Sequence, residues 1–536
     1  VHNVEALEVL LYDGTRMRLG WMTDAEFIAA GRRPGREGAV YSALRALRDR
    51  YADRIRERFP RMPRRVSGYN LDALLPGVDG RLNPARALVG SEGTCAVILE
   101  ATLRLVDLRP ERSVVLLGYP DVATAGDRVA DVLAAGIDPM AVEGMDRILR
   151  DHLRKKNPPE VGALDLLPEG DGWLLVQVGG DARSDVDARV ERLVEHLRGA
   201  ASAPLGVRVL TDAATQERFW TVREMGLGAT AFVPGEHDTW PGWEDSAVPP
   251  ERMGDYLRDL RALFDRHGYS AALYGHFGTG CVHCRGDFDL ASAEGVARYR
   301  AFIDAATELI TQRYHGSLSG EHGDGQARAE FLARMFGAEI VEAFREFKRI
   351  WDPDGGMNPG KIVDAYRIDE DLRLGPDYAP AAPATYFQFP DDRGSFARAT
   401  LRCVGVGECR RLETHGGVMC PSYLVTEEER HSTRGRAHLL WEMLRGDGPI
   451  RGGFRDESVK EALDLCLACK GCKGDCPVNV DVATYKAEFL AHYYEGRLRP
   501  RHAYAFGLID RWARLGALAP GLANLATRVP GLRVIA

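Results

Sequence analysis

The sequence predicts an α+β protein that ends in an all-helical domain, and three observations support this. Between residues 108 and 210, apolar strand-like runs alternate with helical patterns. Between residues 395 and 500, helical segments are punctuated by cysteines. The stretch Pro376–Thr385 is rich in Pro and Ala without periodicity, so it cannot bury a face and predicts a linker between the two parts.

Length and composition narrow the class of protein. The 536 residues carry 70 Lys+Arg against 78 Asp+Glu, a formal charge of −8, and 45% are hydrophobic. Such a chain forms several domains with sizeable cores. It has no apolar run of about 18 residues, so no transmembrane helix is expected. Its densest basic stretch, Arg45–Arg65, is interrupted by acidic residues and predicts a solvated helix face, so nucleic acid is excluded as a partner.

The first 210 residues predict strands and helices in alternation. Val4 to Gly14 predicts a strand and a turn, and Gly93 to Val106 a strand. Ser113–Gly118 and Trp173–Val178 then predict strands, followed by helices over Ala123–Gly136 and Val186–Leu197. Two such units in succession predict an α/β sandwich with helices on one face of an antiparallel sheet.

The later segments are predicted as mostly helical. Residues 211–370, which hold six of the 14 histidines, are interpreted as helices joined by Gly-rich loops. The tail after Arg499 mixes Leu, Ala and Arg, and a packing helix is favoured there over a helix on a membrane surface. No repeat of fixed period occurs.

The cysteines indicate a metal site in a reducing compartment. Seven of the ten lie between Cys403 and Cys476, and a chain this long needs no disulfides to fold. Clustering at short spacings favours metal binding over disulfide bridges. The cytoplasm is therefore expected, with membrane-peripheral attachment through the tail as the alternative.

Four cysteines follow a tight spacing. Cys466, Cys469, Cys472 and Cys476, with Pro477, form a C-x2-C-x2-C-x3-C-P run. Three thiolates two residues apart wrap three corners of an iron–sulfur cube, and the fourth usually serves another cluster. Structural zinc would use two separated pairs. The spacing therefore predicts a 4Fe-4S cluster rather than zinc.

A second set of cysteines lies upstream with less regular spacing. Cys403 and Cys409 precede Cys420, but Val406 stands where a full motif would place a cysteine. Crossed ligation would let Cys420 complete the cluster of the downstream run. Cys403, Cys409 and Cys476 would then hold only a three-iron cluster or one with an external ligand.

Two glycine-rich stretches, Gly275–Arg285 and Ser317–Gly325, carry candidate metal ligands. His276, His283 and Glu321 supply two imidazoles and a carboxylate, a reasonable set for a divalent ion with open positions. The intervening glycines let the backbone approach a flat ligand closely.

Structural alternatives remain for these residues. A lone histidine is by default a satisfied structural residue, although Glu321-His322 flanked by glycines is harder to explain by packing. Cys281 and Cys284 form a C-x2-C pair that would suit redox chemistry or zinc. Because His283 sits between them, packing is the favoured interpretation.

Together these stretches resemble the FAD-linked 2-hydroxyacid dehydrogenase family of the vanillyl-alcohol-oxidase type. The closest group is similar to D-2-hydroxyglutarate and D-lactate dehydrogenases with a fused iron–sulfur domain. The match covers nearly the whole chain in order, which is more specific than any one motif. The residues that carry it are Val66–Leu71, Val89–Thr94, Arg223-Glu224, Glu244–Pro249, His276–Arg285, Ser319–Gly325 and Met357–Lys361.

The resemblance implies roles at matching positions. His276, His283 and Glu321 match ligands of zinc or a similar divalent ion, and His322 matches the general base. Arg223 and Arg285 match positions that hold substrate carboxylates. The residues implied to contact FAD are Gly90, Ser91, Glu92, Gly93, Thr94 and Asn358.

The resemblance also implies a domain order. Residues 1–107 would be the second half of a PCMH-type FAD-binding domain, and 108–375 a ferredoxin-like α/β substrate domain. Residues 376–394 would be a linker, 395–500 an all-α 4Fe-4S ferredoxin-type domain, and 501–536 a helical tail.

Three departures from the family pattern are visible. Thr279 stands where the loop often has Asp, and Trp243 where D-2-hydroxyglutarate dehydrogenases place a substrate lysine. The third is that no Gly-rich pyrophosphate loop precedes Val1. The chain is therefore expected to lack the amino-terminal half of the flavin domain, which the full protein or a partner chain would supply.

The predicted function is a flavin- and iron–sulfur-dependent dehydrogenase that oxidises a D-2-hydroxyacid, D-2-hydroxyglutarate or D-lactate. Electrons would pass from FAD through the 4Fe-4S cluster to an external acceptor, a quinone or a redox protein. One alternative is an electron-transfer subunit without substrate chemistry, and another is a zinc-binding interaction protein. A homo-oligomer is a further expectation.

Overall fold

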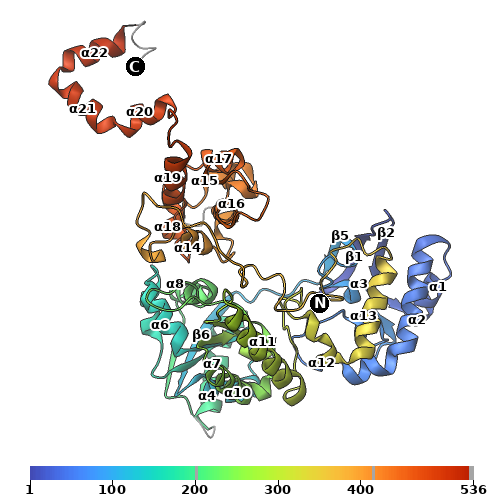
Figure 1. Cartoon of the computed structure of the whole chain (residues 1–536). Helices are drawn as coiled ribbons and strands as arrows, with labels where there is room; N and C mark the ends of the chain where they lie inside the picture. The colour runs from blue at the N-terminus through green and yellow to red at the C-terminus, as the bar shows by residue number, and fades with distance from the viewer. Residues whose placement is uncertain (200–202, 413–416, 530–536) are drawn as a thin grey trace. The chain divides into compact units, whose positions relative to one another are not determined.

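The computed structural model describes residues 1–199, 203–412 and 417–529 (Figure 1). The chain divides into two compact units, Val1–Tyr378 and Ala379–Ala536. The division falls inside the Pro- and Ala-rich stretch, where few side chains can be buried.

The first unit begins with a three-stranded antiparallel sheet in the order β2-β1-β5. Its strands are β1 (Val4–Leu10), β2 (Arg16–Gly20) and β5 (Val97–Leu103). The short strands β3 (Met22–Thr23) and β4 (Arg81–Leu82) form a separate pair, and helices α1 (Asp24–Ala30), α2 (Gly35–Arg58) and α3 (Pro84–Leu88) pack nearby. Strand β5 is at the edge, and all seven of its residues are exposed. Such an edge is a template for pairing with a further strand.

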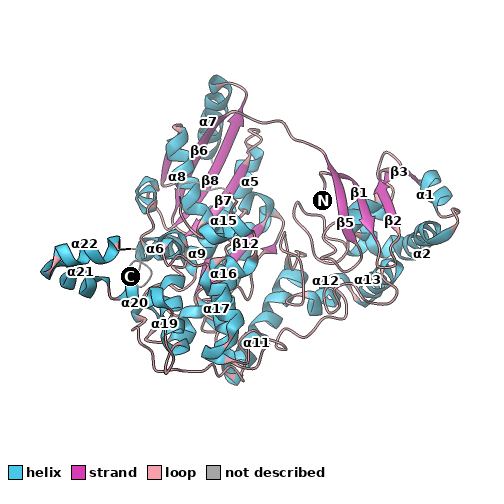
Figure 2. Cartoon of the chain, turned by 90° about the horizontal axis from the view of Figure 1, so that it is seen from above, coloured by secondary structure: helices cyan, strands magenta, loops and turns pink. Residues whose placement is uncertain are grey.

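A seven-stranded antiparallel sheet follows, in the order β10-β12-β11-β7-β8-β6-β9 (Figure 2). The strands are β6 (Glu111–Tyr119), β7 (Ala141–Asp146), β8 (Gly172–Gly180), β9 (Gly206–Leu210), β10 (Ser246–Ala247), β11 (Ala271–Gly275) and β12 (Cys281–Gly286). The predicted antiparallel α/β sandwich is confirmed.

The prediction that helices cover one face of this sheet is wrong, because both faces are covered. The helices on one side are α4 (Val122–Asp127), α5 (Val129–Ala134), α7 (Arg183–Arg198) and α10 (Met253–Arg266), and on the other α6 (Arg147–Lys156) and α8 (Ala213–Glu224). The physical reason lies in β6. Val115 and Leu117 join one core while Val114 and Leu116 join the other, so a strand that is apolar on both sides requires cover on both sides.

The prediction of residues 211–370 as helices and loops is also incomplete. Strands β10, β11 and β12 lie within this segment, and β11 pairs with β12 through a short loop. The Gly-rich composition of residues 275–286 hides this hairpin, since glycine is depleted in strands.

The chain then returns to the first sheet through α11 (Ala293–Glu308), α12 (Leu332–Phe336) and α13 (Ala338–Trp351), with α9 (Gly226–Thr230) preceding them. Helix α13 packs on α2, and the rings of Tyr69 and Phe344 meet edge to face with centroids 5.7 Å apart. A Cβ on Gly68 would lie 2.4 Å from the Phe344 ring, so only glycine permits this close approach. Residues 1–107 and the segment around α13 therefore share one core.

In the second unit the described residues form helices and no strand. The helices are α14 (Phe396–Leu401), α15 (Pro421–Thr426), α16 (Thr433–Arg445), α17 (Glu457–Asp464), α18 (Gly471–Asp475) and α19 (Val482–Tyr493). Their core includes Leu440, Leu444, Val459 and Phe489.

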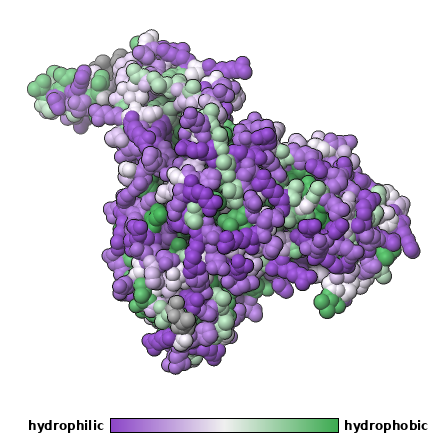
Figure 3. All heavy atoms as spheres, turned by 60° about the horizontal axis from the view of Figure 1, so that its bottom comes forward, coloured by the Kyte–Doolittle hydropathy of each residue, from purple (hydrophilic) through white to green (hydrophobic). Residues whose placement is uncertain are grey.

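The C-terminal helices α20 (Arg501–Gly507), α21 (Ile509–Leu518) and α22 (Pro520–Arg528) pack differently from the sequence expectation. None of their described residues is buried, whereas a packing helix would bury one face. Apolar side chains such as Trp512 and Leu518 are exposed, and the segment shows green in Figure 3. No described helix is long and apolar enough to cross a membrane.

Candidate functional site

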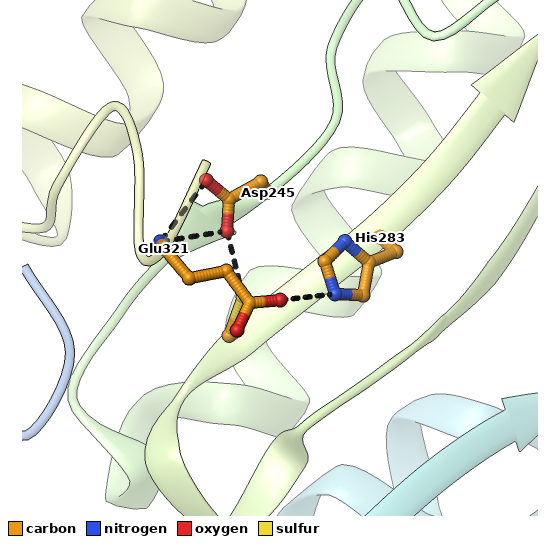
Figure 4. A group of neighbouring side chains, drawn as sticks. Asp245, His283 and Glu321 are labelled. Carbon is orange, nitrogen blue, oxygen red and sulfur yellow. Dashed lines mark hydrogen bonds and ion pairs between the residues drawn. The ribbon is translucent and has the colours of Figure 1, made fainter. Parts of the chain in front are cut away.

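The candidate metal ligands come from three places that are apart in sequence. His276 directly follows β11, His283 lies in the middle of β12, and Glu321 lies in the loop after α11. Because β11 and β12 are antiparallel, Tyr274 faces His283 across the ladder and brings the end of β11 beside the middle of β12. Figure 4 shows Glu321 reaching toward His283 from the neighbouring loop.

One carboxylate oxygen of Glu321 contacts ring nitrogens of three histidines. Glu321 Oε1 lies 3.1 Å from Nε2 of His276 and 3.1 Å from Nε2 of His283. It also lies 3.7 Å from Nε2 of His322. These hydrogen bonds, first from His276 and then from His283, hold the pKa of Glu321 well below its usual range. The structure thus brings His276, His283, Glu321 and His322 into one cluster, called here the His/Glu cluster.

The ion pair of Glu143 and Arg223 contacts this cluster at His276. Glu143 of β7 accepts a hydrogen bond from His276 Nδ1 at 2.8 Å and also pairs with Arg223 of α8. Arg223 Nη2 lies 3.2 Å from the same Nδ1. Burial opposes protonation of His276, but the hydrogen bonds to Glu143 and Glu321 outweigh it and raise the pKa of His276 to about 9. A carboxylate on Nδ1 orients an imidazole so that Nε2 faces a metal.

Two groups of described side chains offer closely spaced ligand atoms to a divalent ion: Asp245, Cys281, His283 and Glu321, and Glu244, His283 and His322. His283 is buried, and its Nδ1 finds no hydrogen-bond partner among the described residues. Its ring can therefore point Nε2 into the site without breaking a bond at Nδ1. Two imidazole nitrogens and a carboxylate suit zinc and similar borderline ions. His276 belongs to neither group, so the assignment of His276, His283 and Glu321 as metal ligands stays a prediction.

Asp245 holds the loop that carries Glu321 and His322. Its carboxylate accepts backbone hydrogen bonds from Glu321 at 3.1 Å and from His322 at 2.8 Å, and one from the Cys281 thiol at 3.0 Å. Asp245 is fully buried and has a φ of +68°. The bonds to Glu321 are drawn in Figure 4. A buried carboxylate so placed compensates the unpaired N–H groups of a tight loop.

The two predicted carboxylate-binding arginines differ in position. Arg223 lies at the His/Glu cluster, as described above. Arg285 shares a face of β12 with His283, but it is only 2% exposed and donates to the carbonyl oxygen of Thr239 at 2.7 Å. Burial lowers the pKa of Arg285. The carboxylate contact of Arg285 stays a prediction.

The predicted flavin loop, Gly90–Thr94, lies against the loop of the His/Glu cluster. The Glu92 carboxylate accepts hydrogen bonds from the backbone of Asp324 at 2.9 Å and of Gly325 at 3.0 Å. Asn358 donates from Nδ2 to the carbonyl of Glu92 at 2.7 Å. Gly90 and Gly93 have positive φ, and a Cβ on either would meet no atom, so the loop borders open space. Ser91 and Thr94 are buried, and the contacts of this loop with FAD stay a prediction.

Four cysteines of the second unit line one cavity. They are Cys420, at the start of α15, and Cys466, Cys469 and Cys472 of the downstream run. Cys420 Sγ receives a hydrogen bond from Thr433 N at 2.9 Å and lies 2.8 Å from Thr433 Oγ1. This is the group that crossed ligation would use, and donors around the sulfurs suit thiolates.

The second set of cysteines is less well grouped. Cys409 is buried in a small cluster with Cys420 and Tyr423, and the Arg434 N–H lies 3.4 Å from Cys409 Sγ. Cys403 and Cys476 are half-buried. The second cluster therefore remains a prediction.

Sequence patterns missed four residues of the site. Arg64, Glu143, Glu244 and Asp245 contact the His/Glu cluster but lie in other segments of the chain. Glu244 and Asp245 belong to a stretch that carries the family resemblance, which was the one signal available. Arg64 and Glu143 had none, because their partners are more than a hundred residues away.

Comparison with known proteins agrees with this architecture. Residues 108–362 match the family of FAD linked oxidases, C-terminal domain, and residues 399–480 match the 4Fe-4S dicluster domain. A D-2-hydroxyglutarate dehydrogenase of Pseudomonas putida is 31% identical over 98% of this chain and 55% of its own length. A D-2-hydroxyglutarate dehydrogenase of Escherichia coli is 29% identical over 92% of this chain and 52% of its own length.

A solved structure of 4-ethylphenol oxidase from Gulosibacter chungangensis matches 68% of this chain and 66% of its own, at 15% identity and a TM-score of 0.40. The chain spans about half the length of the curated relatives that it matches. Residues 108–362 are thus similar to the C-terminal domain of FAD linked oxidases, and residues 399–480 are similar to a 4Fe-4S dicluster domain.

Proposed function

We propose that this chain is part of a dehydrogenase that uses FAD and a 4Fe-4S cluster to oxidise a D-2-hydroxyacid to the 2-oxoacid. The observation that carries the proposal is the convergence of three histidines on one oxygen of Glu321, beside Arg223. The relatives are D-2-hydroxyglutarate dehydrogenases, and D-lactate is the second candidate substrate.

The residues divide the chemistry between them. His276, His283 and Glu321 would hold a divalent ion, Gly90–Thr94 and Asn358 would contact FAD, and Cys420, Cys466, Cys469 and Cys472 would hold the cluster. When bound, these groups supply a Lewis acid for the hydroxyl, a two-electron acceptor and a one-electron carrier.

Residues of this chain accept the hydroxyl proton of the substrate and bind its carboxylate. His322 is half exposed, and its Nε2 faces the His/Glu cluster, so it is placed to take the hydroxyl proton. Arg223 offers a planar guanidinium to the carboxylate beside the reacting carbon. Asp245 keeps His322 in place through the backbone bond described above.

The proposal extends to the electron acceptor and to the cellular compartment. The acceptor of the electrons is a quinone or a redox protein. The clustering of seven cysteines between Cys403 and Cys476 at metal-ligand spacings favours a reducing compartment such as the cytoplasm.

An anaerobic visible spectrum tests the proposal. Flavin bands of the purified protein should bleach on addition of D-2-hydroxyglutarate or D-lactate, above a broad iron–sulfur shoulder. His322→Ala should keep the shoulder and lower the rate of bleaching by about 10²- to 10⁴-fold, the usual contribution of a general base. A shoulder without substrate-dependent bleaching would instead indicate an electron-transfer subunit.

A further inference from the structure

The positive charges around the His/Glu cluster are not equally available to a ligand. Arg223 lies 3.2 Å from His276 Nδ1 with a side chain that is 14% exposed, whereas Arg285 is buried against Thr239. Trp243, which stands where the family resemblance implies a lysine, is 1% exposed and donates its indole N–H to Tyr256 Oη at 3.1 Å. That position therefore supplies no charge to the site.

Arg64 brings a charge from a different part of the chain. It lies in the segment between α2 and residue 71, and its Nη1 pairs with Glu321 Oε2. Its side chain is 35% exposed, so it is open to a ligand. The opposite oxygen of the same carboxylate contacts the histidines.

The surroundings of Arg64 are built for an anion. Arg64, Arg65 and Glu321 line an open cavity of about 810 Å³. The side chain of Arg65 is 10% exposed, and its Nη1 is buried without a hydrogen-bond partner among the described residues, although Nη2 pairs with Asp72 at 2.7 Å. Arg65 thus adds a second positive charge to the lining of the cavity at Arg64.

A continuous series of contacts joins the two arginines. Arg64 contacts Glu321, Glu321 contacts His276, and His276 lies beside Arg223. Arg64 and Arg223 are therefore the two ends of one series of contacts that runs through Glu321 and His276.

We infer that Arg64 binds the second carboxylate of a dicarboxylic 2-hydroxyacid while Arg223 binds the carboxylate beside the hydroxyl. The inference rests on the proposed function and deepens it, because it selects a dicarboxylate over a monocarboxylate such as D-lactate. A guanidinium binds a carboxylate in bidentate fashion, and an acid without the second carboxylate leaves Arg64 paired only with Glu321. Specificity then comes from one charge contributed by the segment before residue 71.

Calorimetric titration of the full chain, loaded with zinc, tests this without turnover. D-2-hydroxyglutarate and D-lactate are the two probes. Arg64→Ala should raise the Kd of D-2-hydroxyglutarate by about 10- to 100-fold, the loss expected for a charge-assisted hydrogen bond. The Kd of D-lactate should change by less than about twofold. Arg64→Lys should restore part of the affinity.

Arg61→Ala is the matched control, because Arg61 lines the same cavity and is exposed. It should change neither Kd. An equal rise in the Kd of both acids in Arg64→Ala, or no rise in either Kd, would overturn the inference and leave the proposed function standing. Loss of zinc from both Arg64 variants would show that Arg64 only positions Glu321, which also overturns it. Binding of neither acid to the unmodified chain would reject the proposed function as well.

Discussion

The two candidate centres of this chain are assembled in opposite ways. In the second unit, three of the four cysteines that line the cavity come from one seven-residue stretch, Cys466–Cys472. In the first unit, the His/Glu cluster comes from the end of β11, from β12 and from the loop after α11, and it is contacted by Glu143 of β7 and by Arg64 from the segment before residue 71. The proposed electron path thus joins a cysteine site built from a local motif and a His/Glu cluster built from residues far apart in sequence.

The difference has a physical origin. A cluster held by thiolates two residues apart needs only a tight turn, and Ala468 and Lys470, which alternate with these cysteines, have positive φ as such turns require. A hydroxyacid site needs a base, a cation and a polarising group at fixed mutual angles. Only rigid strands and helices brought together by a core hold such groups within about 0.5 Å.

Cys466→Ser should have the largest effect, and it breaks the local centre alone. The iron content should fall by about four atoms per chain, with loss of the visible shoulder, because a serine hydroxyl is a poor substitute for a thiolate ligand. Zinc binding at the His/Glu cluster should persist. Cys95→Ser, at a buried cysteine of the first unit, is the control and should retain all iron. Equal iron in both variants would contradict the assignment of the cavity.

Glu143→Gln should have an intermediate effect, and it tests the long-range centre through a residue that no sequence motif marks. Glu143 orients His276 through Nδ1 and neutralises Arg223. Loss of such a supporting carboxylate should weaken zinc binding by about 10- to 100-fold, measured by competition with a chelating dye. Glu169→Gln, at an exposed position, should leave the affinity unchanged. Unchanged zinc affinity in Glu143→Gln would remove Glu143 from the site.

Thr433→Val should have the smallest effect, and it tests whether Cys420 is a ligand of the cluster. The change removes the hydroxyl that lies 2.8 Å from Cys420 Sγ but keeps the backbone N–H. Because hydrogen bonds to the sulfurs stabilise the more negative reduced cluster, the reduction potential should shift downward, with iron content unchanged. Thr400→Val, whose hydroxyl bonds the carbonyl of Ala397, is the control in a redox titration. A potential unaffected by Thr433→Val would mean that Cys420 is not a ligand.

Much of the secondary structure was predictable because it is local. The apolar runs Ser113–Gly118 and Trp173–Val178 mark two central strands, β6 and β8. The number of covered faces was not predictable from the repeat of strand and helix. It followed from the apolar character of β6 on both sides, which a count of helices overlooks.

The tail illustrates the same limit. Its mixed Leu, Ala and Arg content was interpreted as a packing helix, yet none of the described residues of α20–α22 is buried. Composition shows that a face is apolar, but whether that face finds a partner depends on the rest of the molecule.

The sequence by itself determined the cysteine spacing, the pairing of histidines with glycines, and the order of the motifs along the chain. These are local properties, set by neighbouring side chains and by backbone turns. Only the tertiary structure decided that Glu143, Asp245 and Arg64 join the histidines, since their positions depend on strand register and on a shared core. Contacts between residues far apart in sequence are set by packing of the whole unit, and no short stretch of the chain contains them.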